Sequence, residues 1–242
     1  MSTLTNSPND ADGLQADHLR RVAAGMQSAP PTADRVAVVF GAKGGVGTSA
    51  VALAIARDLA ASTKATGVAA LVVDAHAGRN DLAVMSAEGE DTPGLALTTA
   101  AKLGIPAPSG QGAAVTEAAK RLLRAARLWT DDQGGWIVID AGVGDTLWAR
   151  ELAARAMRPL LVTTPDQLAT VNAYVALKRL GLAASRVGLI LNHCQDDAQA
   201  EQSHARLANS CRQFLDKSSS LAGWLPTLSE DPTAATVMAA AA

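Results

Sequence analysis

Short apolar runs alternate along this chain with longer segments whose apolar residues recur at helical spacing. The expected strands span residues 35–40, 68–73, 136–140, 159–164, 186–191 and 221–225. The expected helices between them span residues 49–61, 115–128, 147–156, 167–180 and 198–215. Continuous apolar runs are typical of strands that are covered on both faces, and strand–helix alternation implies right-handed crossovers. We therefore expect an α/β fold with a doubly wound, mostly parallel sheet.

The residues before the first expected strand differ in composition from the rest. Residues 1–11 are mostly small and polar, so we expect a disordered tail. Residues 12–26 are expected to form a short N-terminal helical arm, because Asp12 and Gln15 fit a capping box. Residues 27–34 contain Pro30 and Pro31, which exclude a helix and indicate an extended linker.

The main domain is expected to span residues 35–242. Within it, residues 88–112 are rich in Gly, Pro, Thr and Ala and show no regular pattern. The formal net charge of -2 gives no general attraction to nucleic acid or acidic lipid. Two cysteines, Cys194 and Cys211, fit thiols in a reducing compartment rather than a disulfide framework. With no apolar run of transmembrane length, we expect a cytoplasmic protein.

A glycine-rich segment joins the first expected strand to the first expected helix. It reads Val-Val-Phe-Gly-Ala-Lys-Gly-Gly-Val-Gly-Thr-Ser over residues 38–49. Glycines let backbone amides turn inward around phosphate oxygens, and a helix N-terminus adds its positive dipole end. In this context the pattern predicts a phosphate loop, in which the hydroxyl of Ser49 would ligate Mg²⁺. The alternative is a glycine-rich turn between strand and helix that binds no ligand.

The segment from Lys43 to Ser49 resembles the deviant Walker A motif of the MinD/ParA family of P-loop ATPases, usually Lys-Gly-Gly-Val-Gly-Lys-Thr/Ser. The resemblance implies a P-loop NTPase fold that binds ATP or ADP with Mg²⁺. In that family the first lysine, matched by Lys43, reaches across an ATP-dependent homodimer to the partner's phosphates. Thr48 replaces the second lysine, which removes a charge-assisted phosphate contact of about 1.5–3 kcal/mol. The cofactor-binding positions implied in this loop are Gly44, Gly45, Val46, Gly47, Thr48 and Ser49.

Two further strand ends resemble the metal and catalytic motifs of the same family. Asp74 matches the first carboxylate of Asp-x-Asp-x-Gly, whereas His76 replaces the second, which positions the attacking water. Asp140 opens an Asp-x-Gly-x-Gly turn after a strand that looks like Walker B. The resemblance thus implies Ser49, Asp74 and Asp140 as Mg²⁺ ligands, with Lys43 and His76 in the catalytic positions. N-capping or turn chemistry at strand ends is the alternative for both carboxylates.

Asn192 follows the expected strand 186–191 and matches an asparagine that contacts adenine in the relatives. An asparagine at a strand end is otherwise a turn former, and the sequence leaves both interpretations open. Because Thr48 and His76 replace two catalytic groups at once, we expect ATP hydrolysis to be weak or lost.

Two segments resemble FlhG, the flagellar-number ATPase branch also called YlxH or FleN. Residues 161–166, Leu-Val-Thr-Thr-Pro-Asp, and the later Ala173-Tyr174 and Lys178 are similar to a stretch of that branch. The N-terminal arm contains Gln-Ala-Asp-His-Leu-Arg at residues 15–20, similar to the FlhG activator motif. In relatives this motif docks on the SRP-type GTPase FlhF and stimulates its GTP hydrolysis. The resemblance implies partner-binding roles for Gln15, Ala16, Leu19 and Arg20.

The sequence leaves more than one function open. The first is a regulatory protein that controls flagellar placement or number by activating an FlhF-type GTPase. The alternative is an active, dimerising ATPase switch of the MinD/ParA type that positions a division site or other cargo. A partitioning ATPase that binds DNA nonspecifically is disfavoured by the charge balance. The end of the chain, Thr236-Val237-Met238 and four alanines, lacks the basic amphipathic helix of the relatives, so we expect no autonomous membrane binding.

Overall fold

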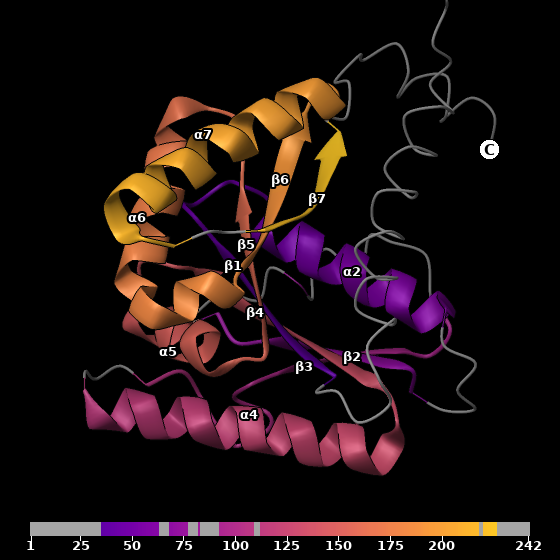
Figure 1. Ribbon diagram of the computed structural model, residues 1–242. Coiled ribbons are helices and arrows are strands. Elements are labelled where there is room, and N and C mark those ends of the chain that lie inside the picture. Colours follow the sequence, from indigo (N-terminus) through magenta and orange to yellow (C-terminus); the bar gives the residue numbers. More distant parts are fainter. Residues whose placement is uncertain are drawn as a thin grey trace, which may run out of the picture.

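The computed structural model describes residues 35–62, 68–76, 82, 92–108, 112–217 and 220–226. Their core is a seven-stranded sheet with the strand order β3-β2-β4-β1-β5-β6-β7 (Figure 1). The pairing of neighbouring strands is parallel throughout these residues. The strands are β1 (Val36–Gly41), β2 (Ala70–Asp74), β3 (Leu95–Thr99), β4 (Trp136–Val143), β5 (Arg158–Thr163), β6 (Gly188–Cys194) and β7 (Ser220–Pro226).

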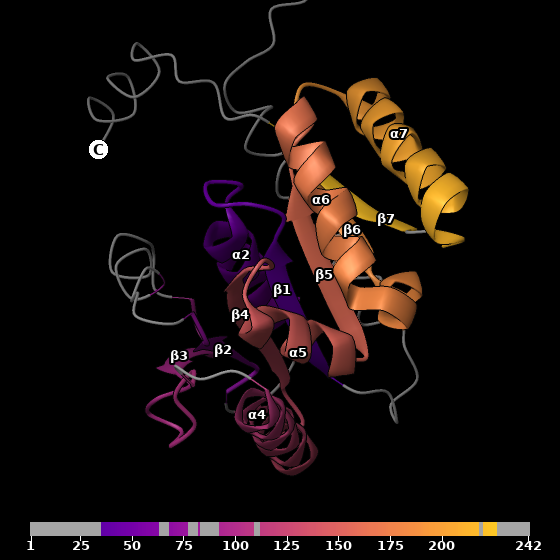
Figure 2. The same ribbon diagram turned by 90° about the vertical axis from the view of Figure 1, so that its left-hand side faces the viewer.

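Helices cover both faces of this sheet. The helices are α2 (Thr48–Ser62), α4 (Ala113–Gln133), α5 (Leu147–Arg155), α6 (Gln167–Leu180) and α7 (Asp197–Leu215), with a 3-10 helix η1 (Gly181–Arg186). Helix α2 packs on one face, and helices α4 to α7 pack on the other. Figure 2 shows α5, α6 and α7 following one another across that second face, with α4 beside α5. The arrangement confirms the expected α/β fold.

Strand β1 shows why this sequence forms a central strand. All of its residues are buried, and successive side chains enter opposite core layers. Val38 and Phe40 face the helices α4 to α7, whereas Ala37 and Val39 face α2. Burying a side chain as large as Phe40 contributes about 1.5–3 kcal/mol, and a strand covered on both faces needs apolar residues at every position.

Several helices begin at a polar residue that caps their first turn. Thr146, Asp166 and Asp196 precede α5, α6 and α7, and each side chain accepts a hydrogen bond from the backbone N–H three residues later. Such caps satisfy amides that have no partner inside the helix, and each contributes about 1 kcal/mol. All three caps lie within three residues of the end of a strand, β4, β5 or β6, that leads to the candidate site described below.

The expected elements match the observed ones with a few corrections. Strand β3 lies inside residues 88–112, which show no regular pattern in the sequence. Helix α4 is longer than expected at both ends, and η1 was not expected. Strand β4 continues to Val143 and strand β6 to Cys194, so Asp140 and Asn192 lie inside their strands rather than at or after the ends. The tail, arm and linker expected in residues 1–34 lie outside the described residues.

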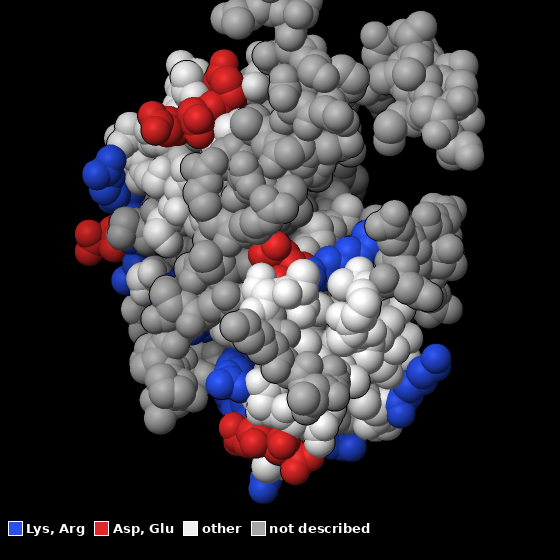
Figure 3. All heavy atoms as spheres, turned by 90° about the vertical axis from the view of Figure 1, so that its right-hand side faces the viewer, with Lys and Arg blue, Asp and Glu red and all other residues white. Residues whose placement is uncertain are grey.

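The part of the chain that the structure describes contains no helix long and apolar enough to cross a membrane. On the face of the molecule shown in Figure 3, the described basic and acidic side chains occur in small separate groups.

Candidate functional site

The glycine-rich loop, residues 42–47, lies between the end of β1 and the start of α2, as expected from the sequence. Gly45 and Gly47 have φ angles of 80° and 82°, a left-handed backbone that side chains with a Cβ rarely adopt. The amide of Ala42 donates to the carbonyl of Val162 in β5 at 2.8 Å, and Val51 donates to Gly47 at 2.9 Å. The loop is therefore held at both ends, by the neighbouring strand and by the first turn of α2.

Thr48 is the first residue of α2, and its hydroxyl packs directly against Gly41. A Cβ at position 41 would collide with this hydroxyl, so a side chain there would require the Thr48 side chain to move. Against the pattern Gly-x-x-x-x-Gly-Lys-Ser/Thr, Ala42 stands in the place of the first glycine and Thr48 in the place of the lysine. Ala42 has no positive φ, which explains how the loop tolerates a Cβ at that position.

Asp74 ends β2, and Asp140 lies beside it in β4, three residues before that strand ends. They are register partners in the parallel pair formed by β2 and β4. Both side chains are buried, and one oxygen of each accepts a backbone N–H two residues later, from His76 at 2.9 Å and from Gly142 at 3.0 Å. These short turns fix the direction of both carboxylates.

The turn after Asp140 lies against the glycine-rich loop. The amide of Gly144 donates to the carbonyl of Gly41 at 2.8 Å. A Cβ at Gly144 would lie 2.8 Å from the ring of Phe40, so a side chain there would push the two loops apart. The carboxyl ends of β2, β4 and β1 thus bring Asp74, Asp140 and the glycine-rich loop to one edge of the sheet, where ligands bind in open α/β sheets.

His76 connects the loop after β2 to the turn after β4. Its ring lies so close to Gly142 that a Cβ there would be 2.6 Å from Cδ2. Gly142 also has a φ of 71°, which glycine adopts without strain. The imidazole therefore packs on the backbone of the turn that Asp140 opens.

Lys43 leaves the loop toward β5 rather than toward the two carboxylates. Its Nζ lies 3.4 Å from Oδ2 of Asp166, the N-cap residue of α6. Partial burial acts to raise the pKa of Asp166, but hydrogen bonds from Thr164 and from the amide of Ala169, together with the charge of Lys43, outweigh it and lower the pKa. The Lys43 and Asp166 side chains are 31% and 47% exposed, so solvent screens their attraction.

Asn192 reaches the glycine-rich loop from β6. Its Nδ2 donates to the carbonyl of Val46 at 2.9 Å, and its Oδ1 accepts from the amide of His193 at 3.0 Å. The side chain is 7% exposed and lies directly against Gly47.

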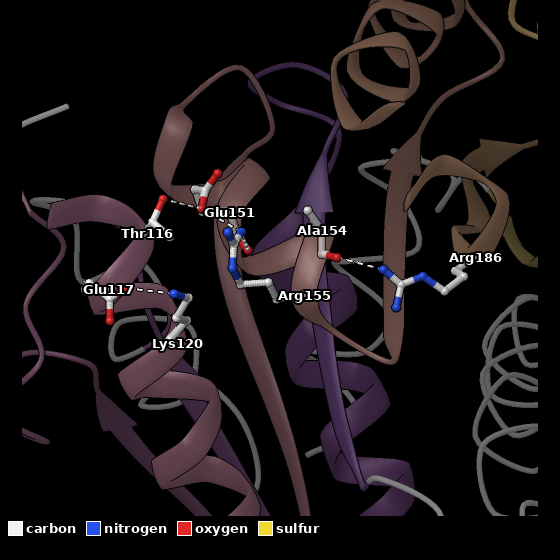
Figure 4. Close-up of polar contacts among 7 residues, drawn as sticks. All are labelled: Thr116, Glu117, Lys120, Glu151, Ala154, Arg155 and Arg186. Carbon is white, nitrogen blue, oxygen red and sulfur yellow. Dashed lines mark hydrogen bonds and ion pairs between the residues drawn. The ribbon is translucent and has the colours of Figure 1, made fainter. Parts of the chain in front are cut away.

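Helix α5 packs next to the site, because it begins a few residues after Asp140 and the end of β4. The indole N–H of Trp148 donates to the carbonyl of Ala75, the residue before His76, at 2.7 Å. Further along, Glu151 accepts a hydrogen bond from Thr116 of α4 at 2.7 Å and pairs with Arg155 at 2.6 Å (Figure 4). Arg186 donates to the carbonyl of Ala154 at 2.7 Å. Helix α5 is thus tied to α4, to η1 and to the end of β2.

The structure brings most of the sequence-derived candidates together at this edge of the sheet. They are Lys43, Gly44, Gly45, Val46, Gly47, Thr48, Ser49, Asp74, His76, Asp140 and Asn192. Gln15, Ala16, Leu19 and Arg20 lie outside the described residues. Asp166 and Trp148 also contact this site, and neither was expected to do so from the sequence. No motif in the sequence marks either residue as part of the site. Only the fold shows that Asp166 contacts Lys43 and that Trp148 contacts Ala75 at the end of β2.

The oxygen groups at this edge fit a Mg²⁺ ion with nucleotide phosphates. Mg²⁺ prefers oxygen ligands, usually one or two carboxylates with water and substrate phosphates. Asp74 and Asp140 provide two buried carboxylates, and Ser49 provides a hydroxyl in the first turn of α2. The glycine-rich loop and the start of α2 provide backbone amides for an anion.

No protein-family model matches this sequence, and no curated protein sequence matches it. Solved structures do share its fold. A ParA family ATPase from Chlorobium tepidum TLS has a TM-score of 0.52 at 19% identity, covering 86% of this chain and 90% of that one. The cell division ATPase MinD from Pyrococcus furiosus has a TM-score of 0.52 at 19% identity, covering 83% and 85%.

A third similar structure has a different activity. The kinase domain of the Escherichia coli tyrosine kinase Etk has a TM-score of 0.54 at 16% identity, covering 79% of this chain and 81% of that one. The chain therefore has the α/β fold seen in MinD and ParA proteins. One fold serves several activities, so the fold alone does not define the function of this chain.

Proposed function

We propose that this chain is a nucleotide-binding regulatory protein, similar to FlhG and MinD, that binds ATP or ADP with Mg²⁺ and hydrolyses ATP weakly or not at all. The observation that carries the proposal is the placement of Asp74 and Asp140 in register beside the loop of residues 42–47. A strand, a glycine-rich loop and a helix N-terminus form an anion site, and two adjacent carboxylates add a cation site.

Each group at this edge has a defined part in binding. The amides of the loop and of the first turn of α2 would hold phosphate oxygens. The hydroxyl of Ser49 and the carboxylates of Asp74 and Asp140 would hold Mg²⁺, directly or through water. When bound, Mg²⁺ neutralises phosphate charge. Thr48 supplies only a hydroxyl in the place of the lysine, so affinity for phosphates is reduced.

Two observations argue against rapid hydrolysis. Thr48 carries no positive charge to stabilise the charge that develops on the phosphates. His76 packs its ring on Gly142, whereas the relatives have a carboxylate at this position to orient the attacking water. An imidazole held in this way is a poor substitute for that carboxylate.

We further propose that the arm of residues 12–26 activates an FlhF-type GTPase and so controls flagellar placement or number. Gln15, Ala16, Leu19 and Arg20 would form the contact, as the resemblance to the FlhG activator motif implies. A glutamine both donates and accepts hydrogen bonds, which suits the completion of a partner's active site. An arginine suits an acidic surface or a phosphate.

An active, dimerising ATPase switch is the second candidate, and Lys43 favours it. Its ammonium group is partly exposed beside the loop and is held by an exposed carboxylate. A weak surface pair of this kind contributes about 0–1 kcal/mol, so Lys43 can leave Asp166 at little cost and reach a second subunit.

Titration calorimetry of the full chain with ATP and Mg²⁺ tests nucleotide binding. We expect saturable binding that depends on Mg²⁺ and is lost in the variant Asp140→Asn, with Asp145→Asn in the exposed part of the next turn as the control. Equal binding by wild type and Asp140→Asn, or no binding by wild type, contradicts the proposed metal-dependent nucleotide site.

A further inference from the structure

Asn192 connects two parts of the candidate site that are far apart in the sequence. Its Nδ2 donates to the carbonyl of Val46, 146 residues earlier, and the resemblance to MinD and ParA proteins assigns it instead to the adenine base. We infer that Asn192 is a positioning residue, which fixes the glycine-rich loop in the shape that accepts phosphate whatever base follows. This inference rests on the proposed nucleotide site.

The backbone conformation at the end of β6 directs the Asn192 side chain toward Val46. The register of β6 with β7 breaks between Leu191 and Cys194. His193 has a φ of 59°, a left-handed conformation that is uncommon for a residue with a side chain. The same local turn lets the His193 amide donate to Oδ1 of Asn192 at 3.0 Å, which fixes the amide group with its Nδ2 toward Val46.

The loop at the other end of this contact depends on the donor. Val46 is fully buried. If its carbonyl loses the donor, the unsatisfied buried acceptor destabilises this conformation of the loop by about 1–3 kcal/mol. In a trans peptide the carbonyl of Val46 and the N–H of Gly47 point in opposite directions. The hydrogen bond to Asn192 therefore turns the Gly47 N–H away from β6. Gly47 is the residue directly before α2, so its N–H belongs to the group of amides at the start of that helix.

Close packing supports the same conclusion. The amide group of Asn192 lies directly against Gly47, so any Cβ at position 47 would collide with it. Gly47 also has a φ of 82°. The position is therefore restricted to glycine for two reasons, the backbone conformation and the contact with Asn192.

The test separates an effect on the loop from a contact with the base. Binding of ATP and of inorganic tripolyphosphate, which has no base, is measured by calorimetry with Mg²⁺ for the full chain and for Asn192→Asp. This variant keeps the size of the side chain but has no N–H to donate and adds a negative charge beside an anion site. The uncharged variant Asn192→Leu, which is similar in size, is therefore measured with it. The control is Asn209→Asp on the exposed side of α7, where the Oδ1 that accepts from Arg212 is retained.

We expect the uncharged Asn192→Leu, as well as Asn192→Asp, to weaken ATP and tripolyphosphate by the same factor, about tenfold, which corresponds to 1.4 kcal/mol. Asn209→Asp should bind both as wild type does. A loss confined to ATP, with tripolyphosphate unchanged, would assign Asn192 to the base and overturn the inference. Unchanged binding of both ligands would overturn it as well.

Hydrogen exchange of the protein without ligand provides a second readout. The amides of residues 44–49 should exchange at least about tenfold faster in Asn192→Asp and in Asn192→Ala than in wild type, because the lost contact makes local opening easier. Unchanged exchange of these amides in both variants overturns the inference. This measurement holds even if the wild-type chain binds neither ligand, a result that would contradict only the proposed nucleotide site.

Discussion

At residue 48 a threonine hydroxyl packs on Gly41 at the point where the similar motif of MinD and ParA proteins carries a lysine. The surrounding loop keeps its left-handed glycines and its bonds to β5 and α2. The substitution therefore removes a positive charge and leaves the backbone that would surround a phosphate in place.

The variant Thr48→Lys should therefore bind ATP with Mg²⁺ about tenfold more tightly or better, since a charge-assisted hydrogen bond contributes about 1.5–3 kcal/mol. Thr48→Met is the matched control, because it is similar in length but has no charge. Calorimetry measures both. If Thr48→Met gains as much affinity as Thr48→Lys, charge is not what the loop lacks.

Gly142 gives a second prediction at this scale. Gly142→Ala should destabilise the protein by about 1–2 kcal/mol for the left-handed backbone alone, and by more because the methyl group meets the His76 ring. In a His76→Ala background the collision disappears and only the backbone cost remains. Urea unfolding of the four proteins in this cycle measures the difference, and equal costs in both backgrounds would show that His76 does not pack on Gly142.

The two cysteines give a prediction with a pH dependence. Burial raises the pKa of the Cys194 thiol to about 12, with a smaller contribution from the charge of Asp196, and burial also raises the pKa of Cys211. An unfolded thiol ionises near pH 8.5. The folded protein therefore keeps a proton that the unfolded chain loses, so stability declines as the pH rises from about 9 toward 12.

Replacing Cys194 by alanine should make this alkaline decline in the free energy of unfolding shallower. In the folded wild type both thiols should react slowly with a disulfide reagent at pH 8, and quickly after denaturation. Rapid labelling of native protein at pH 8 contradicts the burial of these thiols.

At the scale of whole elements, helices and strands were predictable where a buried pattern is long and regular. Helix α6 was predicted with its observed bounds, because Asp166 caps it and its apolar residues recur at helical spacing. Strand β3 was not predicted, since Leu95–Thr99 is a half-buried edge strand and lacks the continuous apolar run of a central strand. An edge strand depends on its single neighbour, here β2, which a local pattern does not reveal.

In the candidate site, too, local motifs were predictable, whereas contacts between distant segments were not. Lys43, Asp74 and Asp140 were predictable because they lie in recognisable motifs at or near the carboxyl ends of strands. The contacts of Lys43 with Asp166 and of Asn192 with Val46 join β5 and β6 to the glycine-rich loop. They depend on the order of strands in the sheet, and no local spacing encodes that order.

A further prediction concerns the helix proposed for residues 12–26. An isolated helix of this length is marginal in water, so we expect a peptide of residues 10–26 to be mostly unfolded when free and helical when bound to its partner. The peptide should stimulate GTP hydrolysis by an FlhF-type GTPase from the same cell, and Gln15→Ala or Arg20→Ala should weaken the effect. Full hydrogen-exchange protection of residues 14–26 in the isolated protein, together with an inactive peptide, would contradict an activator role.

For the whole molecule, the two candidate functions differ in what ATP does to the association state. A regulator that holds nucleotide as a structural ligand keeps the same sedimentation coefficient with and without ATP and Mg²⁺, and this is the result we expect for the wild-type chain. A switch forms dimers only with ATP, and Lys43→Ala then abolishes the dimer. The variant Thr48→Lys combined with His76→Asp is the informative companion, because it restores both replaced groups and should hydrolyse ATP faster than wild type. ATP-dependent dimers of the wild-type chain that Lys43→Ala dissolves would establish the switch, because a lysine held only by an exposed carboxylate then has its function in a second subunit.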